Sequence, residues 1–347
     1  MYSTDSNANP ANPSAVASPS TAGDDGWCGP LFIVGMPRSG TKLLRGLLSR
    51  HPRVRIPDAE TEFFPFLARW VRDHGPAESE RAFAALFESL RTATYFTYRR
   101  PEQAPFSWQE WRRECEGRYD AASLFEAFIR YELGAARRSG IIWGDKSPAY
   151  IRHIDLLLEH FPDARIVHLV RDVRDFCVSS RKVWNKDVRR AAYQWGRDVA
   201  AAHRVCQAQP RCLEIRYEDL LRSPETQLRR LSRLLRIDFS DAMTRLDRAV
   251  EHHGDAAGHA EIVQDNFSKF SSRLTPRELR EIESLAWDTM KALGYEPLHA
   301  TRQKHLGAAE QSLLRFKDGI RLVAGAARTR GLTGALLFHL SHARLSR

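Results

Sequence analysis

The sequence predicts an α/β fold of three layers, with a central parallel sheet flanked by helices. Short apolar runs recur along the 347 residues, beginning at Leu31, Ile141, Arg165 and Cys212. Each run is followed by a polar turn and then by a segment with apolar residues at helical spacing. Strands that alternate with helices are typical of parallel sheets, because a helix returns the chain to the edge where the next strand begins.

The first predicted strand, residues 31–34, leads into a turn bounded by Gly35 and Gly40. A helix is expected next, because four leucines recur at helical spacing before the dipeptide His51-Pro52: Leu43, Leu44, Leu47 and Leu48. Such a loop directs backbone N–H groups and a helix N-terminus toward one point, which attracts a phosphate or sulfate. Arg38 and Lys42 add side-chain cations.

The spacing of Gly35 and Gly40 is that of a nucleotide-binding P-loop, in which Lys and then Ser or Thr follow the second glycine. Here Thr41 and Lys42 follow, and the cation precedes that glycine, as Arg38 in Pro-Arg-Ser-Gly-Thr. This order resembles the phosphosulfate loop of sulfotransferases, Pro-(Lys/Arg)-Ser-Gly-Thr-Thr, with Lys42 in place of the second Thr. A glycine-rich turn without a ligand is the alternative.

The resemblance covers about residues 30–296. It implies a P-loop-like fold and a sulfuryl donor, 3′-phosphoadenosine 5′-phosphosulfate (PAPS). The loop residues that it implies in donor binding are Arg38, Ser39, Gly40, Thr41, Lys42 and Leu43.

A second anion site is expected after the strand at residues 165–170, where Arg171-Asp-Val-Arg174-Asp175 turns into a helix. This resembles the sulfotransferase element Arg-Asp-x-Arg-Asp, in which the first arginine and a serine eight residues later bind the 3′-phosphate of the donor. Arg171 and Ser179 have that spacing, and a guanidinium offers a two-pronged donor to phosphate. Alternatively, the arginines and aspartates pair with one another, which is the simpler explanation of Arg174 and Asp175.

Two further residues are implied in donor binding by the resemblance. Tyr217 opens a Tyr-Glu-Asp-Leu motif whose tyrosine lies against adenine in sulfotransferases; a half-buried aromatic residue at a strand end is the alternative. Lys269-Phe270 is similar to a Lys-Trp pair whose lysine contacts the nucleotide, with Phe in place of Trp.

Glu60 and Glu62 precede a helix expected from about Phe63 to Asp73, and they are candidates for a proton acceptor. The resemblance favours Glu60 as the base over Glu62; the alternative is that both only stabilise the helix N-terminus. Lys146 is expected at the carboxyl end of a strand, where open parallel sheets bind their ligands. A Lys-x-Pro element that is similar in the family places it in the active site.

Helices are expected in four later stretches. They run from Pro148 to about His160, from Val188 to about Gln207, from Pro224 to about Leu235, and from a capping box at Thr275 and Glu278 to near Leu293.

The composition divides the chain into three parts. Residues 1–26 lack an apolar block and are expected to form a disordered leader. The α/β domain is expected over 27–300, with a helical insertion at about 77–138, and a basic helical tail over 301–347. Aromatic residues of the insertion are expected either to line an acceptor pocket or to pack in the core: Tyr95, Phe96, Tyr98, Trp108 and Trp111.

The net charge of +10 is concentrated in the tail, where nine Lys and Arg face Glu310 and Asp318. A groove for nucleic acid would distribute its cations through the fold, so no nucleic-acid partner is expected. The tail interleaves apolar and basic residues. It is expected either to pack on the domain as a helix or to rest on anionic lipid at the inner membrane surface.

The five cysteines form no C-x-x-C pair and are expected to be free thiols in a reducing cytoplasm. No metal-ligand spacing such as H-E-x-x-H occurs, so no metal is expected. No stretch reaches the roughly 18 apolar residues that span a membrane, and a secretion signal is lacking, so a cytoplasmic location is expected.

Together these residues predict a sulfotransferase that moves a sulfuryl group from PAPS to a hydroxyl or amine of a small-molecule, carbohydrate or lipid acceptor. The acceptor attacks in line, Glu60 takes its proton, and Arg38 and Lys146 neutralise charge on the bridging oxygen. One alternative is a P-loop kinase or NTPase that uses ATP and Mg²⁺, with Asp172 as the metal's aspartate. The other is a non-catalytic protein that binds a nucleotide or a lipid surface.

Overall fold

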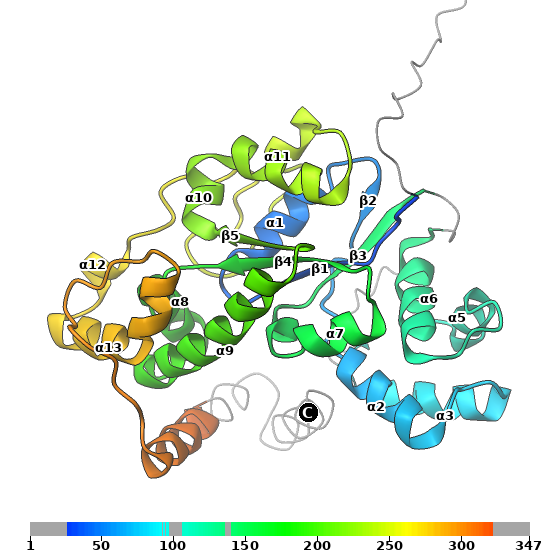
Figure 1. The fold of residues 1–347 in the computed structure, drawn as a ribbon, viewed down its shortest axis with the longest axis horizontal. Helices are drawn as coiled ribbons and strands as arrows, with labels where there is room; N and C mark the ends of the chain where they lie inside the picture. The colour runs from blue at the N-terminus through cyan, green and yellow to red at the C-terminus, as the bar shows by residue number, and fades with distance from the viewer. Residues whose placement is uncertain (1–25, 92, 94, 97–105, 136–139, 322–347) are drawn as a thin grey trace, which may run out of the picture.

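The structure is a computed structural model that describes residues 26–91, 93, 95, 96, 106–135 and 140–321. Within these residues the centre is a five-stranded parallel sheet in the order β2-β3-β1-β4-β5 (Figure 1). The strands are β1 (Leu31–Gly35), β2 (Val54–Arg55), β3 (Ile142–Lys146), β4 (Arg165–Val170) and β5 (Cys212–Arg216). The predicted α/β class is therefore confirmed.

Strand β1 lies in the middle of the sheet, between β3 and β4. Its Phe32 pairs with Asp145 of β3 and with Ile166 of β4. All residues of these three strands are buried, as expected where helices cover both faces of a sheet. The edge strand β2 is not among the predicted strands. It has only two residues, which is too short for an apolar run to be visible in the sequence.

Helices cover both faces of the sheet (Figure 1). Leu31 and Ile33 of β1 pack on one face and Phe32 and Val34 on the other, because alternate residues of a strand point to opposite sides. The first face is covered by α1 (Thr41–Leu48), α10 (Tyr217–Arg222) and α11 (Pro224–Leu235). The second face is covered by α7 (Ile154–His160), α8 (Val173–Trp184), α9 (Val188–Ala208) and α13 (Pro276–Ala292).

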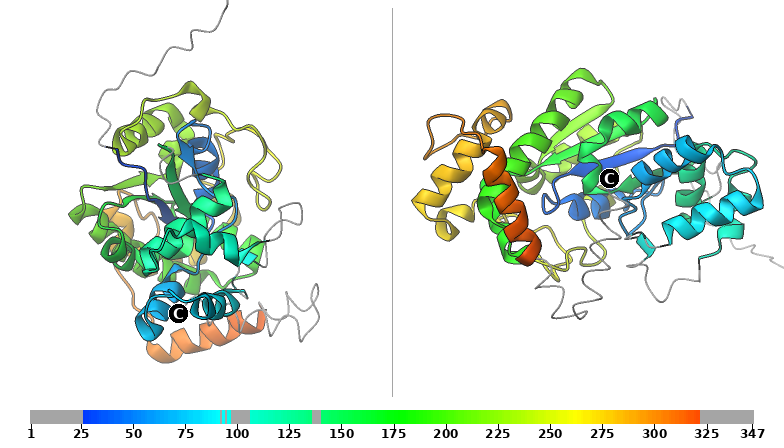
Figure 2. Two further views of the ribbon diagram at one scale, coloured as in Figure 1. Left: turned by 90° about the vertical axis from the view of Figure 1, so that its right-hand side faces the viewer. Right: turned by 90° about the horizontal axis from the view of Figure 1, so that it is seen from below.

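The helical insertion lies beside β3, at the end of the sheet where β2 is the edge strand (Figures 1 and 2). It consists of α3 (Glu80–Leu90), α5 (Trp108–Glu114) and α6 (Ala121–Leu133), next to α2 (Phe64–His74). The ring of Phe128 lies 5.0 Å from that of Tyr95 and 5.5 Å from that of Trp111. Tyr95 and Trp111 are buried and Phe96 and Trp108 pack against the same core, so these residues form core and not a pocket lining; Tyr98 lies outside the described residues.

The later helices lie close to the predicted positions. The expected helix from Pro148 is split into a 3₁₀ turn, η1 (Pro148–Arg152), and α7. The capping box of α13 is confirmed, since the Thr275 hydroxyl accepts from the Glu278 N–H and the Glu278 carboxylate accepts from the Thr275 N–H. Two short elements complete the domain, η2 (Asp241–Thr244) and α12 (Phe270–Arg273).

The expectation of five free thiols is wrong at two positions. A disulfide joins Cys206 in the last turn of α9 to Cys212, the first residue of β5, with a Cα–Cα distance of 4.9 Å. The short turn from α9 to β5 brings the two thiols together. The side chains of Cys28, Cys115 and Cys177 remain thiols.

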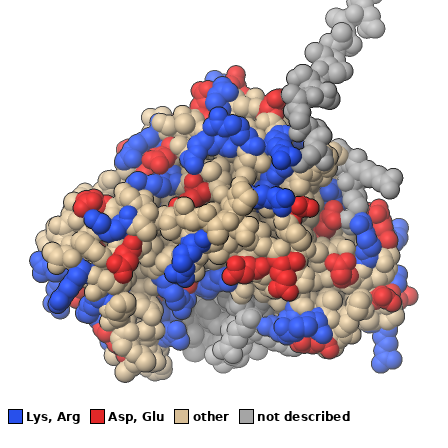
Figure 3. Space-filling view, in the orientation of Figure 1, with Lys and Arg blue, Asp and Glu red and all other residues tan. Residues whose placement is uncertain are grey.

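The described part of the tail contains a helix over residues 308–321. Its Leu314 packs into the core and its Asp318 is buried, so this part is packed on the domain. The rest of the predicted tail, 322–347, lies outside the described residues. Within the described residues, no helix has both the length and the apolar composition that a membrane span requires. On the face in Figure 3, cations and carboxylates are interspersed.

Candidate active site

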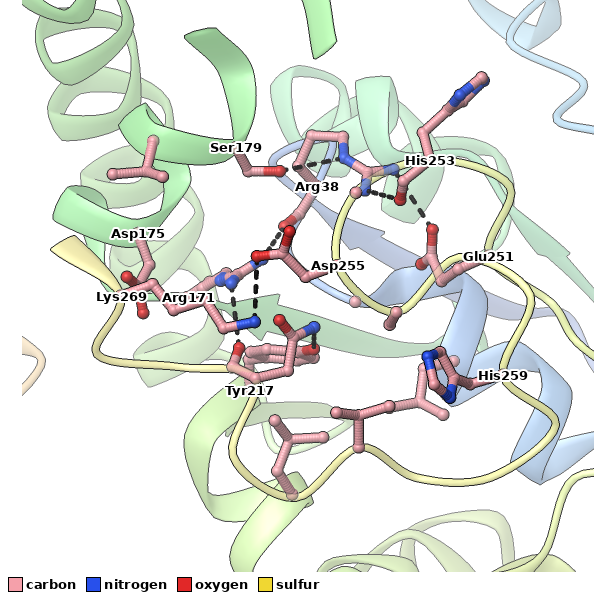
Figure 4. A pocket seen from close by; sticks show the side chains of 18 of the residues that line it. Arg38, Arg171, Asp175, Ser179, Tyr217, Glu251, His253, Asp255, His259 and Lys269 are labelled. Atoms are coloured by element: carbon pink, nitrogen blue, oxygen red, sulfur yellow. Dashed lines mark hydrogen bonds and ion pairs between the residues drawn. The ribbon is translucent and has the colours of Figure 1, made fainter. Parts of the chain in front are cut away.

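A pocket lies at the carboxyl ends of β1, β4 and β5, the edge at which open parallel sheets bind ligands. The turn after β1, helix α8 and the segment 245–269, which joins η2 to α12, form its walls (Figure 4). The residues predicted to bind the donor that line it are Arg38, Gly40, Leu43, Arg171, Ser179, Tyr217 and Lys269. Ser39 in the adjoining loop and Thr41 at the start of α1 are buried, and neither these two residues nor Lys42 lines the pocket.

The turn after β1 has two residues in the left-handed region, Arg38 with φ 75° and Gly40 with φ 89°. Gly40 precedes the first residue of α1 and accepts a hydrogen bond from the N–H of Leu44 at 3.1 Å. A Cβ atom at Gly40 would lie 2.3 Å from the ring of Tyr217. Glycine is therefore required here both by the backbone angle and by the close approach of the ring.

The Arg38 guanidinium joins three walls of the pocket (Figure 4). It donates to the Ser179 hydroxyl of α8 at 3.3 Å, to the Glu251 carboxylate at 3.3 Å and to the His253 carbonyl at 2.7 Å. A hydrogen bond thus joins the two predicted anion sites, one in the loop and the other on α8.

Arg171 lies at the floor of the pocket, directly after β4. Its Nη1 donates to the Arg38 carbonyl at 3.0 Å, and its Nη2 donates to the Asn266 carbonyl at 3.1 Å. The guanidinium carbon lies 4.7 Å from the centre of the Tyr217 ring, whose hydroxyl accepts from the Asn266 side chain at 2.9 Å. Tyr217 is therefore enclosed by Gly40, Arg171 and Asn266, and only 4% of it is exposed.

Lys269 belongs to a cluster of three cations around Asp255. The Asp255 carboxylate pairs with Lys182 at 2.6 Å, with Arg273 at 2.9 Å and with Lys269 at 3.0 Å. Burial alone would raise the pKa of Asp255, but the hydrogen bonds from Lys182 and Lys269 hold it well below the usual range. The three cations form a site for an anion, and the Asp255 carboxylate occupies this site.

Glu60 and Lys146 form an ion pair beside this pocket. Lys146 ends β3 and is fully buried, whereas 29% of the Glu60 side chain is exposed. Burial and the nearby charge of Lys146 lower the pKa of Lys42, while Glu251 and Glu60 act in the opposite direction. Lys42, next to the pocket-lining Leu43, is therefore within electrostatic range of both the pocket and the Glu60–Lys146 pair.

A buried group of hydroxyls lies behind that pair. The hydroxyls of Thr61 and Tyr150 are 2.8 Å apart, and the Ser147 hydroxyl accepts from the Glu62 N–H at 3.3 Å. Burial raises the pKa of the adjacent Asp145 to about 7, against the lowering influence of Ser147 and Lys146. Carboxyl groups with pKa values near neutrality are concentrated at functional sites.

The expectation that charges of the Arg171–Asp175 element pair with one another is confirmed for Arg174. Its guanidinium pairs with Asp172 at 2.7 Å and with Glu283 at 3.0 Å. Asp175 instead accepts from the N–H groups of Ser268 and Phe270, at 2.6 Å and 3.0 Å, and so holds the residues on either side of Lys269.

Several site residues were not predicted. Glu251, Asp255, Lys182 and Arg273 carry no motif, and the sequence gives no signal for them beyond their charge. Asp145 precedes Lys146 at the strand end, which is a signal that could have singled it out. No cluster of three or more His, Cys, Asp or Glu side chains suited to a metal occurs among the described residues.

Comparison with known proteins identifies several sulfotransferases among the relatives of this chain. The protein-tyrosine sulfotransferase of Drosophila melanogaster is 25% identical over 77% of this chain, and protein-tyrosine sulfotransferase 1 of Danio rerio is 28% identical over 66% of it. The chain spans only 52% and 57% of these two proteins. The omega-hydroxy-beta-dihydromenaquinone-9 sulfotransferase Stf3 of Mycobacterium tuberculosis is 28% identical, over 65% of this chain and 68% of that protein.

Solved structures share the fold. The sulfotransferase domain from the curacin biosynthetic pathway superimposes with a TM-score of 0.54 at 18% identity, over 78% of this chain and 99% of that one. The domain from the Synechococcus PCC 7002 olefin synthase gives 0.52 at 23% identity, over 77% and 94%. These likenesses support the P-loop-like fold.

A family model described as the sulfotransferase family matches residues 30–241, which is more than half of the chain. This match includes the turn after β1, Glu60, Lys146 and the Arg171–Ser179 element. The protein therefore belongs to the sulfotransferase family.

Proposed function

We propose that this protein transfers a sulfuryl group from PAPS to an acceptor hydroxyl. The observation that carries the proposal is the convergence of Arg38, Arg171 and Ser179 on one pocket, next to the Glu60–Lys146 pair. PAPS carries charge at two separate positions, a 5′-phosphosulfate and a 3′-phosphate. A pocket with two neighbouring cationic segments suits such a molecule better than one with a single phosphate loop.

Donor groups in the pocket and in the adjoining loop are available for such a ligand. The Ser39 hydroxyl and the Arg171 Nε are buried and have no hydrogen-bond partner among the residues that the structure describes. Buried polar atoms are ordinarily paired, so such atoms favour a ligand. The turn before α1 would hold the 5′-phosphosulfate, Arg171 and Ser179 the 3′-phosphate, and Lys269 would add a cation.

The chemistry assigns a task to each member of the Glu60–Lys146 pair. PAPS, when bound, supplies an electrophilic sulfur and a phosphate as leaving group. As the acceptor oxygen bonds to sulfur, the bond from sulfur to the bridging oxygen breaks and its electron pair stays on that oxygen. Glu60 takes the acceptor proton, while Lys146 and Arg38 stabilise the charge that gathers on the bridging oxygen.

The acceptor is proposed only as a class. The names of the relatives specify a tyrosine hydroxyl in one case and the hydroxyl of a menaquinone derivative in another. Both are oxygen nucleophiles on bulky molecules, so we propose a hydroxyl-bearing acceptor for this chain also. The aromatic residues of the insertion give no further guide, because those that the structure describes pack in the core.

A kinase or NTPase is the weaker candidate. It would require Asp172 to bind Mg²⁺, but Arg174 donates to both oxygens of this carboxylate, and one oxygen also caps α8 by accepting from the Arg174 N–H. The loop also lacks the Lys-Ser/Thr pair that follows the second glycine of a P-loop.

Calorimetry tests the proposal directly. We expect tight binding of the product 3′,5′-bisphosphoadenosine and weak binding of ATP with Mg²⁺. Turnover is then measured as bisphosphoadenosine released from PAPS with phenol and alkyl alcohol acceptors. If ATP with Mg²⁺ bound tightly and bisphosphoadenosine did not, the protein would instead be assigned as a kinase or NTPase. Binding of bisphosphoadenosine without turnover on any acceptor would leave a nucleotide-binding protein and overturn the proposed transfer.

A further inference from the structure

The helix over residues 308–321 presents an apolar stripe to solvent. Of the four large apolar side chains that are exposed in the described part of the chain, three lie on this helix. Leu313 is 51% exposed, Phe316 67% and Ile320 54%. Their spacing of three and then four residues places them on one side of the helix, and we call them the outer stripe.

The opposite side of the same helix is anchored to the domain. Leu314 packs into the core, and the buried Asp318 carboxylate accepts from the Asp187 N–H at 3.0 Å and pairs with Arg190 at 2.8 Å. Glu310 pairs with Arg189. The helix therefore lies against the start of α9, on the outside of the α8, α9 and α13 layer (Figure 2), and the outer stripe has a fixed orientation.

Exposed cations accompany the outer stripe on its helix. Arg315 and Lys317 are exposed on either side of Phe316 in the sequence, and the single acidic residue from 311 onward, Asp318, is buried and paired. The chain continues through residues 322–347 with four arginines and no Asp or Glu. A partner that covers the outer stripe must therefore accommodate positive charge as well as apolar side chains.

We propose that the outer stripe and its flanking cations rest on the surface of a membrane that contains anionic lipid. The three apolar side chains enter the boundary between headgroups and acyl chains, and Arg315 and Lys317 lie among the phosphates. A second copy of this chain fits less well. A symmetric pairing of the stripe would bring the same cations of both copies together.

The test uses the full chain with vesicles of two compositions, phosphatidylcholine alone and a two-to-one mixture with phosphatidylglycerol. Cosedimentation should show binding to the mixed vesicles that weakens with added salt, because screening reduces attraction to the headgroups. The variant Leu313→Ser/Phe316→Ser/Ile320→Ser should bind the mixed vesicles at least about tenfold more weakly, because it removes the apolar contact. Leu298→Ser is the matched control, since Leu298 is 65% exposed but lies outside this helix.

Three results would overturn the proposal. The wild-type chain could fail to bind mixed vesicles, or the triple variant could bind them as well as wild type does. In the third, light scattering without lipid shows a wild-type dimer that the triple variant lacks, which would assign the stripe to a contact between copies. Circular dichroism of the triple variant checks that it is folded. Vesicle binding through the outer stripe is independent of the proposed sulfuryl transfer.

Discussion

Arg38 and Ser179, which are 141 residues apart in the chain, are joined by a hydrogen bond of 3.3 Å from the guanidinium to the hydroxyl. One belongs to the loop expected to hold the 5′-phosphosulfate and the other to the helix expected to hold the 3′-phosphate. The same guanidinium pairs with Glu251 at 3.3 Å. In the structure, these side chains therefore bond to one another at the place where a nucleotide with two charged ends is proposed to bind.

Replacing Ser179 with Ala should weaken binding of 3′,5′-bisphosphoadenosine by about tenfold, because a hydrogen bond to a charged phosphate is lost. Binding of adenosine 5′-phosphate, which has no 3′-phosphate, should not change. Calorimetry of both ligands separates the two cases. Ser180→Ala is the matched control, since Ser180 is the next residue of α8 but is buried and does not line the pocket. Equal losses for both nucleotides would place Ser179 away from the 3′-phosphate.

Replacing Asp255 with Asn should strengthen binding of bisphosphoadenosine, by about tenfold. The Asp255 carboxylate neutralises Lys182, Lys269 and Arg273, and an incoming phosphate must compete with it for these cations. Titration calorimetry at low and high salt measures the gain and its electrostatic origin. Asp265→Asn, an exposed change in the same segment, controls for net charge. Weaker binding by Asp255→Asn would mean that this carboxylate positions the cations for the ligand.

The sequence was a good guide to the strands that are buried on both faces. Such strands read as continuous apolar runs, and β4 was predicted from Arg165 to Val170 as the structure has it. The short edge strand β2 was missed because two residues give no pattern. Arg38 and Arg171 were both expected in loops that follow strands, and they converge because these strands, β1 and β4, are neighbours in the parallel sheet.

The contacts of the segment 245–269 could not be predicted. Its Glu251 and Asp255 lie in a stretch without strand and with no motif, and they meet their cations only through the tertiary fold. The packing of Tyr217 on Gly40 could not be predicted either. A motif identifies the tyrosine but does not show which residues will lie against its ring. The disulfide was missed for a similar reason, since six residues of separation do not reveal that a helix end and a strand start will meet.

Replacing Glu60 with Gln should lower kcat by about 10²–10⁴, the range for loss of a general base, and Lys146→Ala should cost about 10²–10³. Glu60 pairs with Lys146, whereas the backbone N–H of the neighbouring Glu62 donates to Ser147. Glu62→Gln is therefore the matched control and should keep most of the activity. Steady-state rates with PAPS and calorimetry of bisphosphoadenosine separate chemistry from binding. A larger loss for Glu62→Gln than for Glu60→Gln would exchange their roles.

Replacing Gly40 with Ala should destabilise the fold by about 2–3 kcal/mol and abolish binding of bisphosphoadenosine. Its φ of 89° disfavours any side chain, and the new Cβ would meet the Tyr217 ring at 2.3 Å. Gly134→Ala is the matched control, because Gly134 is also left-handed, with φ 57°, but has nothing within 4 Å of an added Cβ. Gly134→Ala should lower the free energy of unfolding by about 1 kcal/mol, because it introduces backbone strain alone. If urea denaturation showed the same loss in the free energy of unfolding for Gly40→Ala and Gly134→Ala, the contact with Tyr217 would be unimportant.

Replacing Asp145 with Asn should stabilise the protein increasingly as the pH rises from about 4 to about 7. Burial raises the pKa of Asp145 from 3.8 to about 7 in the folded protein, so the charged form is disfavoured there relative to the unfolded chain. The stability that the neutral carboxyl contributes is complete below pH 4 and is lost as the pH approaches 7. The shift corresponds to a difference on the order of 4 kcal/mol between wild type and variant at pH 8. Urea denaturation of both proteins across this range measures it, with the exposed Asp155→Asn as the baseline. If the difference in the free energy of unfolding between wild type and Asp145→Asn did not change with pH, Asp145 would have the same pKa in the folded and unfolded chains.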